Sequence, residues 1–155
     1  MTTEEMNIYK LRITQAGIAE LTLIMLEMEM QWLDEAVAAF DAEDVEGFMD
    51  CAGKAQSTQV ELMNVLNVKN SVALDTYSVF AYINKMIIES KIKRQPQDLG
   101  RCRDMLAKFH KSFQAIAGTD NGGPVIEHSE KVYAGLTYGV HGLVESSEGG
   151  HDYSC

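Results

Sequence analysis

The stretch from Leu21 to Leu33, LTLIMLEMEMQWL, constrains the fold more than any other segment of the chain. Nine of its thirteen residues are apolar, and Leu, Met, Glu and Gln are all strong helix formers. On a helix, the apolar residues of this region fall into two stripes whose centres are roughly 150° apart. One stripe holds Leu21, Met25, Met28 and Trp32, and the other holds Leu23, Leu26, Met30, Leu33 and Val37. A bundle helix needs a single stripe of about 100°, so this helix has more apolar surface than four helices alone are expected to bury.

A second segment, residues 71–93, repeats this two-sided pattern. One stripe holds Val72, Val79, Ile83, Met86 and Ile87, and the opposite stripe holds Leu74, Tyr77, Ala81, Ile88 and Ile92. Two interpretations account for the surplus: the N-terminal segment or a corner of the bundle covers it, or it forms a groove for another chain's amphipathic helix. The nine methionines favour the groove slightly, because their flexible side chains suit surfaces that repack around a partner.

The chain up to Ala117 predicts an all-α fold. It shows no sustained period-2 alternation, and we expect long helices at roughly 17–41, 45–68, 71–93 and 97–117, with a short helical segment at about 5–13. Asp44 and Ser71 are expected as N-cap residues. Because short connections make neighbouring helices antiparallel, residues 1–117 are predicted to form one domain, an antiparallel four-helix bundle with a short N-terminal helical segment.

Residues 118–155 differ in composition from the rest. They hold eight of the twelve glycines, and one Lys against six acidic residues gives them a net charge of −5. We therefore predict a flexible, Gly-rich, acidic C-terminal tail. Within it, residues 132–144 (VYAGLTYGVHGLV) form an apolar island, and we hypothesise that this island docks transiently on a groove of the bundle and competes with a bound partner.

The charge of the chain excludes several classes of partner. A net charge of −10 and a pI near 4.8 would repel nucleic acid and anionic membrane surfaces, so neither is an expected partner. No apolar run reaches the roughly 18 residues of a membrane-spanning helix, and the N-terminus has acids where a signal peptide has bases. We therefore expect a cytoplasmic protein. Its cysteines, Cys51, Cys102 and Cys155, are far apart and predict neither a disulfide framework nor a zinc site.

Recognisable catalytic patterns are missing from the sequence. A carboxylate-metal bundle enzyme would place ExxH pairs on facing helices, but the ExxH from Glu148 to His151 contains two glycines that make a ligating helix improbable. The sequence contains neither GxxxxGK[ST] nor GxGxxG, and no Ser or Cys is paired with a His in a familiar pattern. We predict a protein that is not an enzyme and uses no cofactor, with a carboxylate-metal bundle enzyme as the remote alternative.

A series of segments resembles one known family. Tyr9 is followed by ITQA at residues 13–16, AELTLIMLEMEMQWLDEA at 19–36, GKAQ at 53–56, VELMNVL at 60–66, YSVFAYINKMIIESKIK at 77–93 and FHKSFQAI at 109–116. In order and spacing these segments resemble the FliS family, bacterial cytosolic chaperones for flagellin in the flagellar export pathway. Three positions depart from the family pattern, since Ile18, Phe80 and Phe113 stand where Pro, Tyr and Trp are usual.

The resemblance implies a chaperone that binds the disordered C-terminal segment of flagellin in apolar grooves and prevents premature filament assembly. It also implies that the N-terminal residues cover part of that surface in the free state. The residues expected to bind the partner are Ile8, Tyr9, Ile13, Leu21, Ile24, Met25, Met28, Tyr77, Phe80, Ile83 and Ile87. Contacts with other flagellar assembly factors, the identity of the flagellin and the oligomeric state stay open. The alternative function is a helical interaction or regulatory module for another partner.

Overall fold

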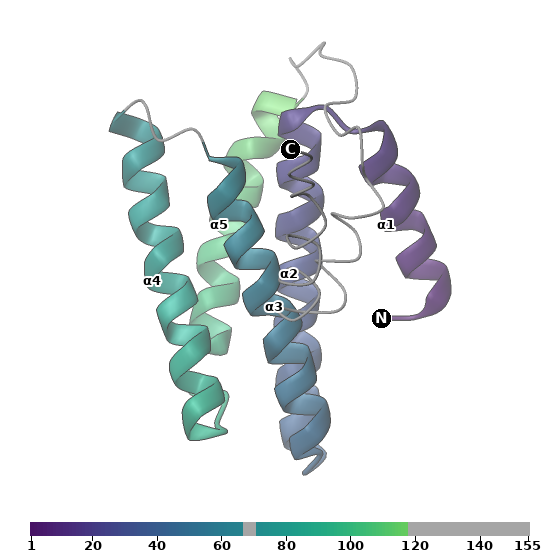
Figure 1. The fold of residues 1–155 in the computed structure, drawn as a ribbon, viewed down its shortest axis with the longest axis vertical. Coiled ribbons are helices and arrows are strands. Elements are labelled where there is room, and N and C mark those ends of the chain that lie inside the picture. Colours follow the sequence, from purple (N-terminus) through teal and green to yellow (C-terminus); the bar gives the residue numbers. More distant parts are fainter. Residues whose placement is uncertain (67–70, 118–155) are drawn as a thin grey trace, which may run out of the picture.

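The computed structural model describes residues 1–66 and 71–117, and this part of the chain is entirely α-helical. It contains α1 (Thr3–Gln15), α2 (Ile18–Asp41), α3 (Val45–Val65), α4 (Ser71–Lys93) and α5 (Leu99–Ala117). Figure 1 shows α2 to α5 as an antiparallel bundle with α1 beside it. The predicted four-helix bundle with an N-terminal helix is confirmed, and the predicted tail at 118–155 lies outside the described residues.

The ends of the helices follow local capping signals. Asp44 is the N-cap of α3, as predicted, and its Oδ1 accepts a hydrogen bond of 2.9 Å from the amide of Gly47. Ser71, expected as an N-cap, is instead the first residue of α4. The N-terminal helix is longer than expected because Thr2 and Glu5 form a capping box at its start.

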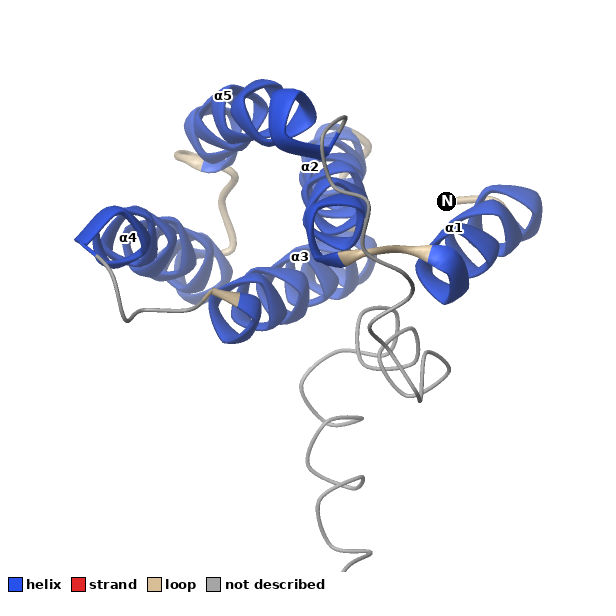
Figure 2. Cartoon of the chain, turned by 90° about the horizontal axis from the view of Figure 1, so that it is seen from above, coloured by secondary structure: helices blue, strands red, loops and turns tan. Residues whose placement is uncertain are grey.

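The position of α2 explains its two apolar stripes. Figure 2 shows α2 between α3 and α5, with α4 across the bundle and α1 on the outside. On one side, the ammonium of Lys54 in α3 lies 4.7 Å above the ring centroid of Trp32. On the other side, Arg103 of α5 donates to Asp34 at 2.7 Å. The bundle covers most of both stripes, because all residues of the first stripe and Leu23, Leu26 and Leu33 of the second are at most 5% exposed, while Met30 and Val37 are partly buried.

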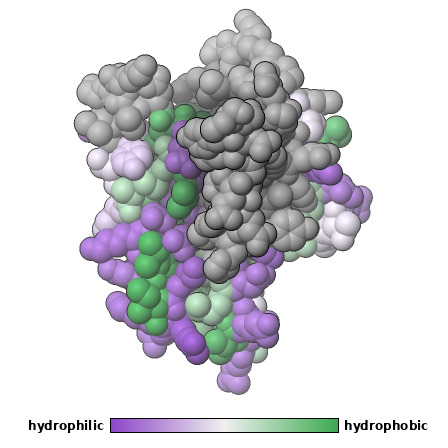
Figure 3. All heavy atoms as spheres, viewed as in Figure 1, coloured by the Kyte–Doolittle hydropathy of each residue, from purple (hydrophilic) through white to green (hydrophobic). Residues whose placement is uncertain are grey.

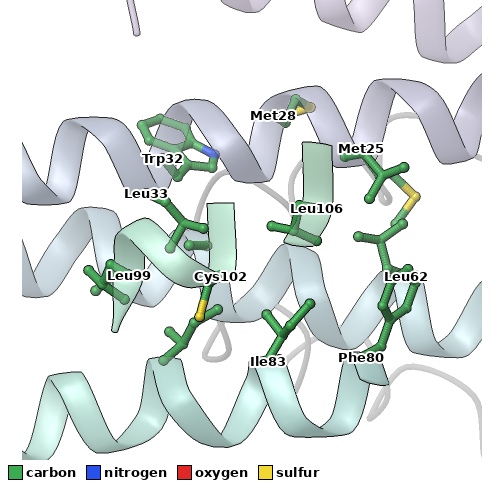
Figure 4. Close-up of a cluster of buried hydrophobic side chains, with 14 of the residues drawn as sticks. Met25, Met28, Trp32, Leu33, Leu62, Phe80, Ile83, Leu99, Cys102 and Leu106 are labelled. Atoms are coloured by element: carbon green, nitrogen blue, oxygen red, sulfur yellow. The ribbon is translucent and has the colours of Figure 1, made fainter. Parts of the chain in front are cut away.

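One core joins the four bundle helices. The close-up in Figure 4 shows inward-pointing side chains such as Leu33, Leu62, Ile83 and Leu106, which come from α2, α3, α4 and α5 in turn. All four are at most 1% exposed. Such dense packing of apolar side chains supplies most of the stability of a small bundle.

The burial of α2 includes a polar residue, Glu29, which the helical pattern places with Thr22 between the two stripes. Its carboxyl is fully buried, and neither oxygen has a hydrogen-bond partner among residues 1–66 and 71–117. Burial therefore raises the pKa of Glu29 well above its ordinary value. Burial, together with the nearby Glu29, also raises the pKa of the Cys102 thiol to about 12, so this thiol is inert at neutral pH.

The two apolar stripes of α4 differ in how deeply they are buried. Ile83, Met86 and Ile87 of the first stripe are buried in the core. In the second stripe, Tyr77 is 36% and Ile92 is 77% exposed, and Ala81 and Ile88 are half-buried. The apolar surplus of the sequence therefore remains open on α4, although the bundle covers it on α2.

Candidate partner-binding site

The residues predicted to bind a partner divide into a buried and an accessible group. The buried group, each at most 4% exposed, comprises Ile13, Leu21, Ile24, Met25, Met28, Phe80, Ile83 and Ile87. In the accessible group, Ile8 is 55% and Tyr77 is 36% exposed, and Tyr9 is half-buried. The buried group belongs to the core of the free chain, so these side chains could meet a partner only if helices moved apart.

The helix α4 carries accessible apolar side chains along one face. Tyr77, Ala81, Ile88 and Ile92 lie within about 60° of one another on this helix and form what we call the α4 stripe. Figure 3 shows a band of hydrophobic surface on the lower part of α4, between hydrophilic side chains. An apolar band with a polar border is typical of an interaction surface.

The α4 stripe borders a groove formed with α3. This α3–α4 groove has a volume of about 330 Å³ and is lined by Met49, Gln56, Ile88, Lys91 and Ile92. The ammonium of Lys91 donates to Oε1 of Gln56 at 2.8 Å, and burial lowers the pKa of Lys91. No carboxylate of the described residues pairs with Lys91, so the groove combines an apolar lining with an uncompensated positive charge.

A second groove lies on the other side of α4, where this helix has only a narrow contact with α5. This α4–α5 groove has a volume of about 290 Å³ and is lined by Val79, Met105, Lys108, Phe109 and Ser112. Its base is firm, because the rings of Phe109 and Phe80 pack edge to face with centroids 4.9 Å apart. The helix α4 thus has an apolar groove along each side.

Polar contacts hold much of α1 against the bundle. Arg12 donates to Glu27 at 2.6 Å and to Glu20 at 3.2 Å, and the Tyr9 hydroxyl donates to Gln31 at 3.4 Å. Among the described helices α1 contacts α2 alone, along the charged strip between its apolar stripes. Ile13 anchors α1 in the core, whereas Ile8 faces solvent. The helix covers a polar strip of α2 with Arg12 and Tyr9 and reaches the core with Ile13, and its role as a cover over a partner groove stays a prediction.

Glu27 connects three helices through its carboxylate. It accepts from Arg12 of α1, and Nε2 of His110 in α5 lies 3.0 Å from its Oε1. Burial opposes ionisation, but hydrogen bonds from Arg12 and His110 outweigh it and hold the pKa of Glu27 below its ordinary value. The carboxylate of Glu27 is therefore the central acceptor that fixes α1.

Replacing Arg12 with Ala should loosen α1 and leave the bundle intact. The ion pair is about one-third exposed and should contribute about 0.5–1 kcal/mol, so α1 amides should exchange hydrogen roughly two to five times faster. Exchange in α2–α5 should stay unchanged, and Lys85→Ala, which removes a long surface pair on α4, serves as the matched control. Equal exchange of α1 in the wild type and in Arg12→Ala would contradict this assignment.

Acid should loosen α1 in the same way. Because the folded-state pKa of Glu27 is lowered, its contribution is complete above the ordinary value of 4.5 and is lost as the pH falls below it. In the wild type, we expect the protection of α1 amides against hydrogen exchange to decrease as the pH falls below 4.5. The measured exchange rates are first corrected for the intrinsic pH dependence of amide exchange. In Glu27→Gln the same loss should be absent, and an identical acid transition in both proteins would contradict the role of Glu27.

The described part of the chain offers little to a metal or to a membrane. Within residues 1–66 and 71–117, no group of three or more His, Cys, Asp or Glu side chains could hold a metal ion. None of the helices described is both long enough and apolar enough to cross a bilayer.

Sequence reasoning missed several residues of the two grooves. Met49, Lys91 and Met105 were not singled out, because each lies at the edge of a helix face and gains its place only from the neighbouring helix. Ile88 and Ile92 were assigned to the second stripe of their helix but not to the predicted site. The solvent exposure of Ile88 and Ile92 would have identified them as site residues, and exposure cannot be read from the sequence.

The chain matches a known protein family. The model of the family described as "Flagellar protein FliS" matches residues 5–120, which include α2 to α5 and all of α1 except its first two residues. No curated protein matches the chain.

Proposed function

The chain belongs to the FliS family of flagellar chaperones, and on that premise we propose that it binds the C-terminal segment of flagellin in the cytosol and prevents premature filament assembly. The observation that carries this proposal is the open apolar stripe of α4. Tyr77, Ala81, Ile88 and Ile92 recur at helical spacing and remain accessible in the free chain. A stripe of this kind fits the apolar face of an amphipathic helix.

Two grooves add apolar surface beside α4: the α3–α4 groove next to the α4 stripe, and the α4–α5 groove on the other side of the helix. The α3–α4 groove adds Met49, and the α4–α5 groove adds Val79, Met105 and Phe109. Burying about five medium apolar side chains contributes roughly 10 kcal/mol gross. Ordering a disordered segment costs about 2–5 kcal/mol, and lost translational freedom costs more, so roughly micromolar affinity is expected.

The buried members of the predicted set have a different place in this proposal. Residues such as Met25, Phe80 and Ile83 shape the scaffold beneath α4, and the partner makes its first contacts on the exposed stripe. A direct contact with the buried side chains remains a prediction that requires helices to separate. The solvent-facing side of α1, with Ile8 and Leu11, is available for a further contact or for another assembly factor.

Titration with a peptide covering the C-terminal segment of a flagellin tests this function. Binding at micromolar concentration with a gain in peptide helicity, measured by circular dichroism, is the expected result. A scrambled peptide of the same composition is the control and should neither bind nor fold. If the flagellin peptide shows neither binding nor a gain in helicity at tens of micromolar, the result would instead favour a helical interaction module for a different partner.

A further inference from the structure

We infer that residues 132–144 of this chain occupy the α3–α4 groove, so that the chain carries its own competitor for the surface it offers a partner. The competition with flagellin rests on the function proposed above, whereas the docking itself does not. The docking is supported by the chemistry of the groove, the chemistry of the segment and the length of chain between them.

The groove has an apolar lining beside unpaired cations. Met49, Ile88 and Ile92 supply the apolar lining, and Lys91 has the neutral amide of Gln56 as its partner. The next residues, Lys93 and Arg94, are exposed at the same end of α4 and pair with no carboxylate in the described part of the chain. The matching occupant is an apolar segment with carboxylates beside it.

Residues 132–144 have that chemistry. The sequence VYAGLTYGVHGLV contains no Asp, Glu, Lys or Arg. Glu127 and Glu130 precede it, and Glu145 and Glu148 follow it. The apolar residues can enter the groove while these carboxylates approach the cations at the end of α4, an arrangement that increases affinity at low ionic strength.

The connecting chain is long enough for this contact. The groove lies near the end of the bundle where α4 ends and α5 begins, so the connection must run back along α5, whose 19 residues span about 28 Å. Residues 118–131 can span at most about 46 Å. A tether of this length gives an effective concentration on the order of millimolar, so even weak docking is populated.

A paramagnetic label tests the docking without any partner. We would attach a nitroxide at Ser146→Cys in the full chain carrying Cys51→Ser and Cys155→Ser, since Cys102 is buried and unreactive. The amide signals of Met49, Ile88 and Ile92 should broaden, and the broadening should fade in high salt. The charge reversal Lys93→Glu/Arg94→Glu should weaken it, whereas Lys108→Glu/Lys111→Glu on α5 should not. Broadening that is absent, or centred on Met105 and Phe109 instead, would overturn the inference.

The affinity of the chain for the flagellin peptide tests whether residues 132–144 compete with it. Replacing Leu136 and Val140 with Ser in the full chain should tighten binding of the flagellin peptide about three- to tenfold, because the groove is then free more often. The matched control, Val125→Ser/Ile126→Ser, removes two apolar side chains outside the island and should leave the affinity unchanged. Equal affinity of both variants and the wild type would refute the competition. The label experiment reports on docking even where flagellin itself does not bind.

Discussion

Replacing Ile88 and Ile92 with Ser should weaken binding of the flagellin peptide at least about 100-fold. Each side chain should contribute about 1.5–3 kcal/mol when a partner buries it, and the loss of two such contributions exceeds the roughly 2.7 kcal/mol that corresponds to this factor. The free chain should be little destabilised, because Ile92 is 77% exposed before a partner arrives. Calorimetric titration measures the affinity, and circular dichroism checks that the fold is unchanged.

Tyr82 provides a matched control on the same helix. It is 44% exposed and apolar in its ring, but it lies outside the α4 stripe and both grooves. Tyr82→Ser should therefore retain the affinity of the wild type to within a factor of about two, as expected for a side chain outside the interface. An equal loss in both variants would mean that general hydrophobicity, rather than the α4 stripe, attracts the partner.

Replacing Glu29 with Met should raise the free energy of unfolding by about 1–3 kcal/mol at neutral pH. The carboxyl of Glu29 is fully buried without a hydrogen-bond partner, and an unsatisfied buried polar group costs about this much. Methionine fills a similar volume and has no polar group to desolvate. Guanidinium unfolding followed by circular dichroism measures the change.

The stability gained by Glu29→Met should increase with pH. Because burial raises the pKa of Glu29 in the folded state, its cost is smallest below the ordinary value of 4.5 and grows as the pH rises toward the raised value. Glu29→Met should therefore stabilise the chain more at pH 8 than at pH 4. Glu29→Gln should remove this pH dependence but gain less stability, since its amide also lacks partners. A destabilised Glu29→Met with unchanged pH dependence would show that the carboxyl has a partner.

Periodicity was sufficient to predict the helices but not the environment of each face. The two stripes of α2 were correctly read as apolar, yet their angular separation does not say which neighbours they face. Only the arrangement of α3 and α5 on either side of α2 shows that the bundle buries both. Glu29 is the clearest case, because its polar character gives no sign of burial, whereas its position between two packed stripes enforces it.

The N-terminal helix shows a different limit. Ile8, Tyr9 and Ile13 suggested an apolar cover, and Ile13 does reach the core. Several of the contacts that hold α1 nevertheless come from Arg12, whose partners Glu20 and Glu27 lie on the next helix and are brought within reach by the antiparallel packing of α1 on α2. Ion pairs of this kind have no periodic signature, so the sequence alone could not identify them.

Isoleucine methyl NMR tests most directly whether the partner binds on α4. The isoleucines distinguish three regions, with Ile88 and Ile92 on the α4 stripe, Ile8 on the outer side of α1, and Ile24 in the core. On titration of the labelled chain with unlabelled flagellin peptide, we predict that the methyl signals of Ile88 and Ile92 shift first and most, while that of Ile24 changes little. Saturating peptide that leaves Ile88 and Ile92 unmoved, or that shifts Ile24 alone, would contradict the assignment of α4 as the binding surface.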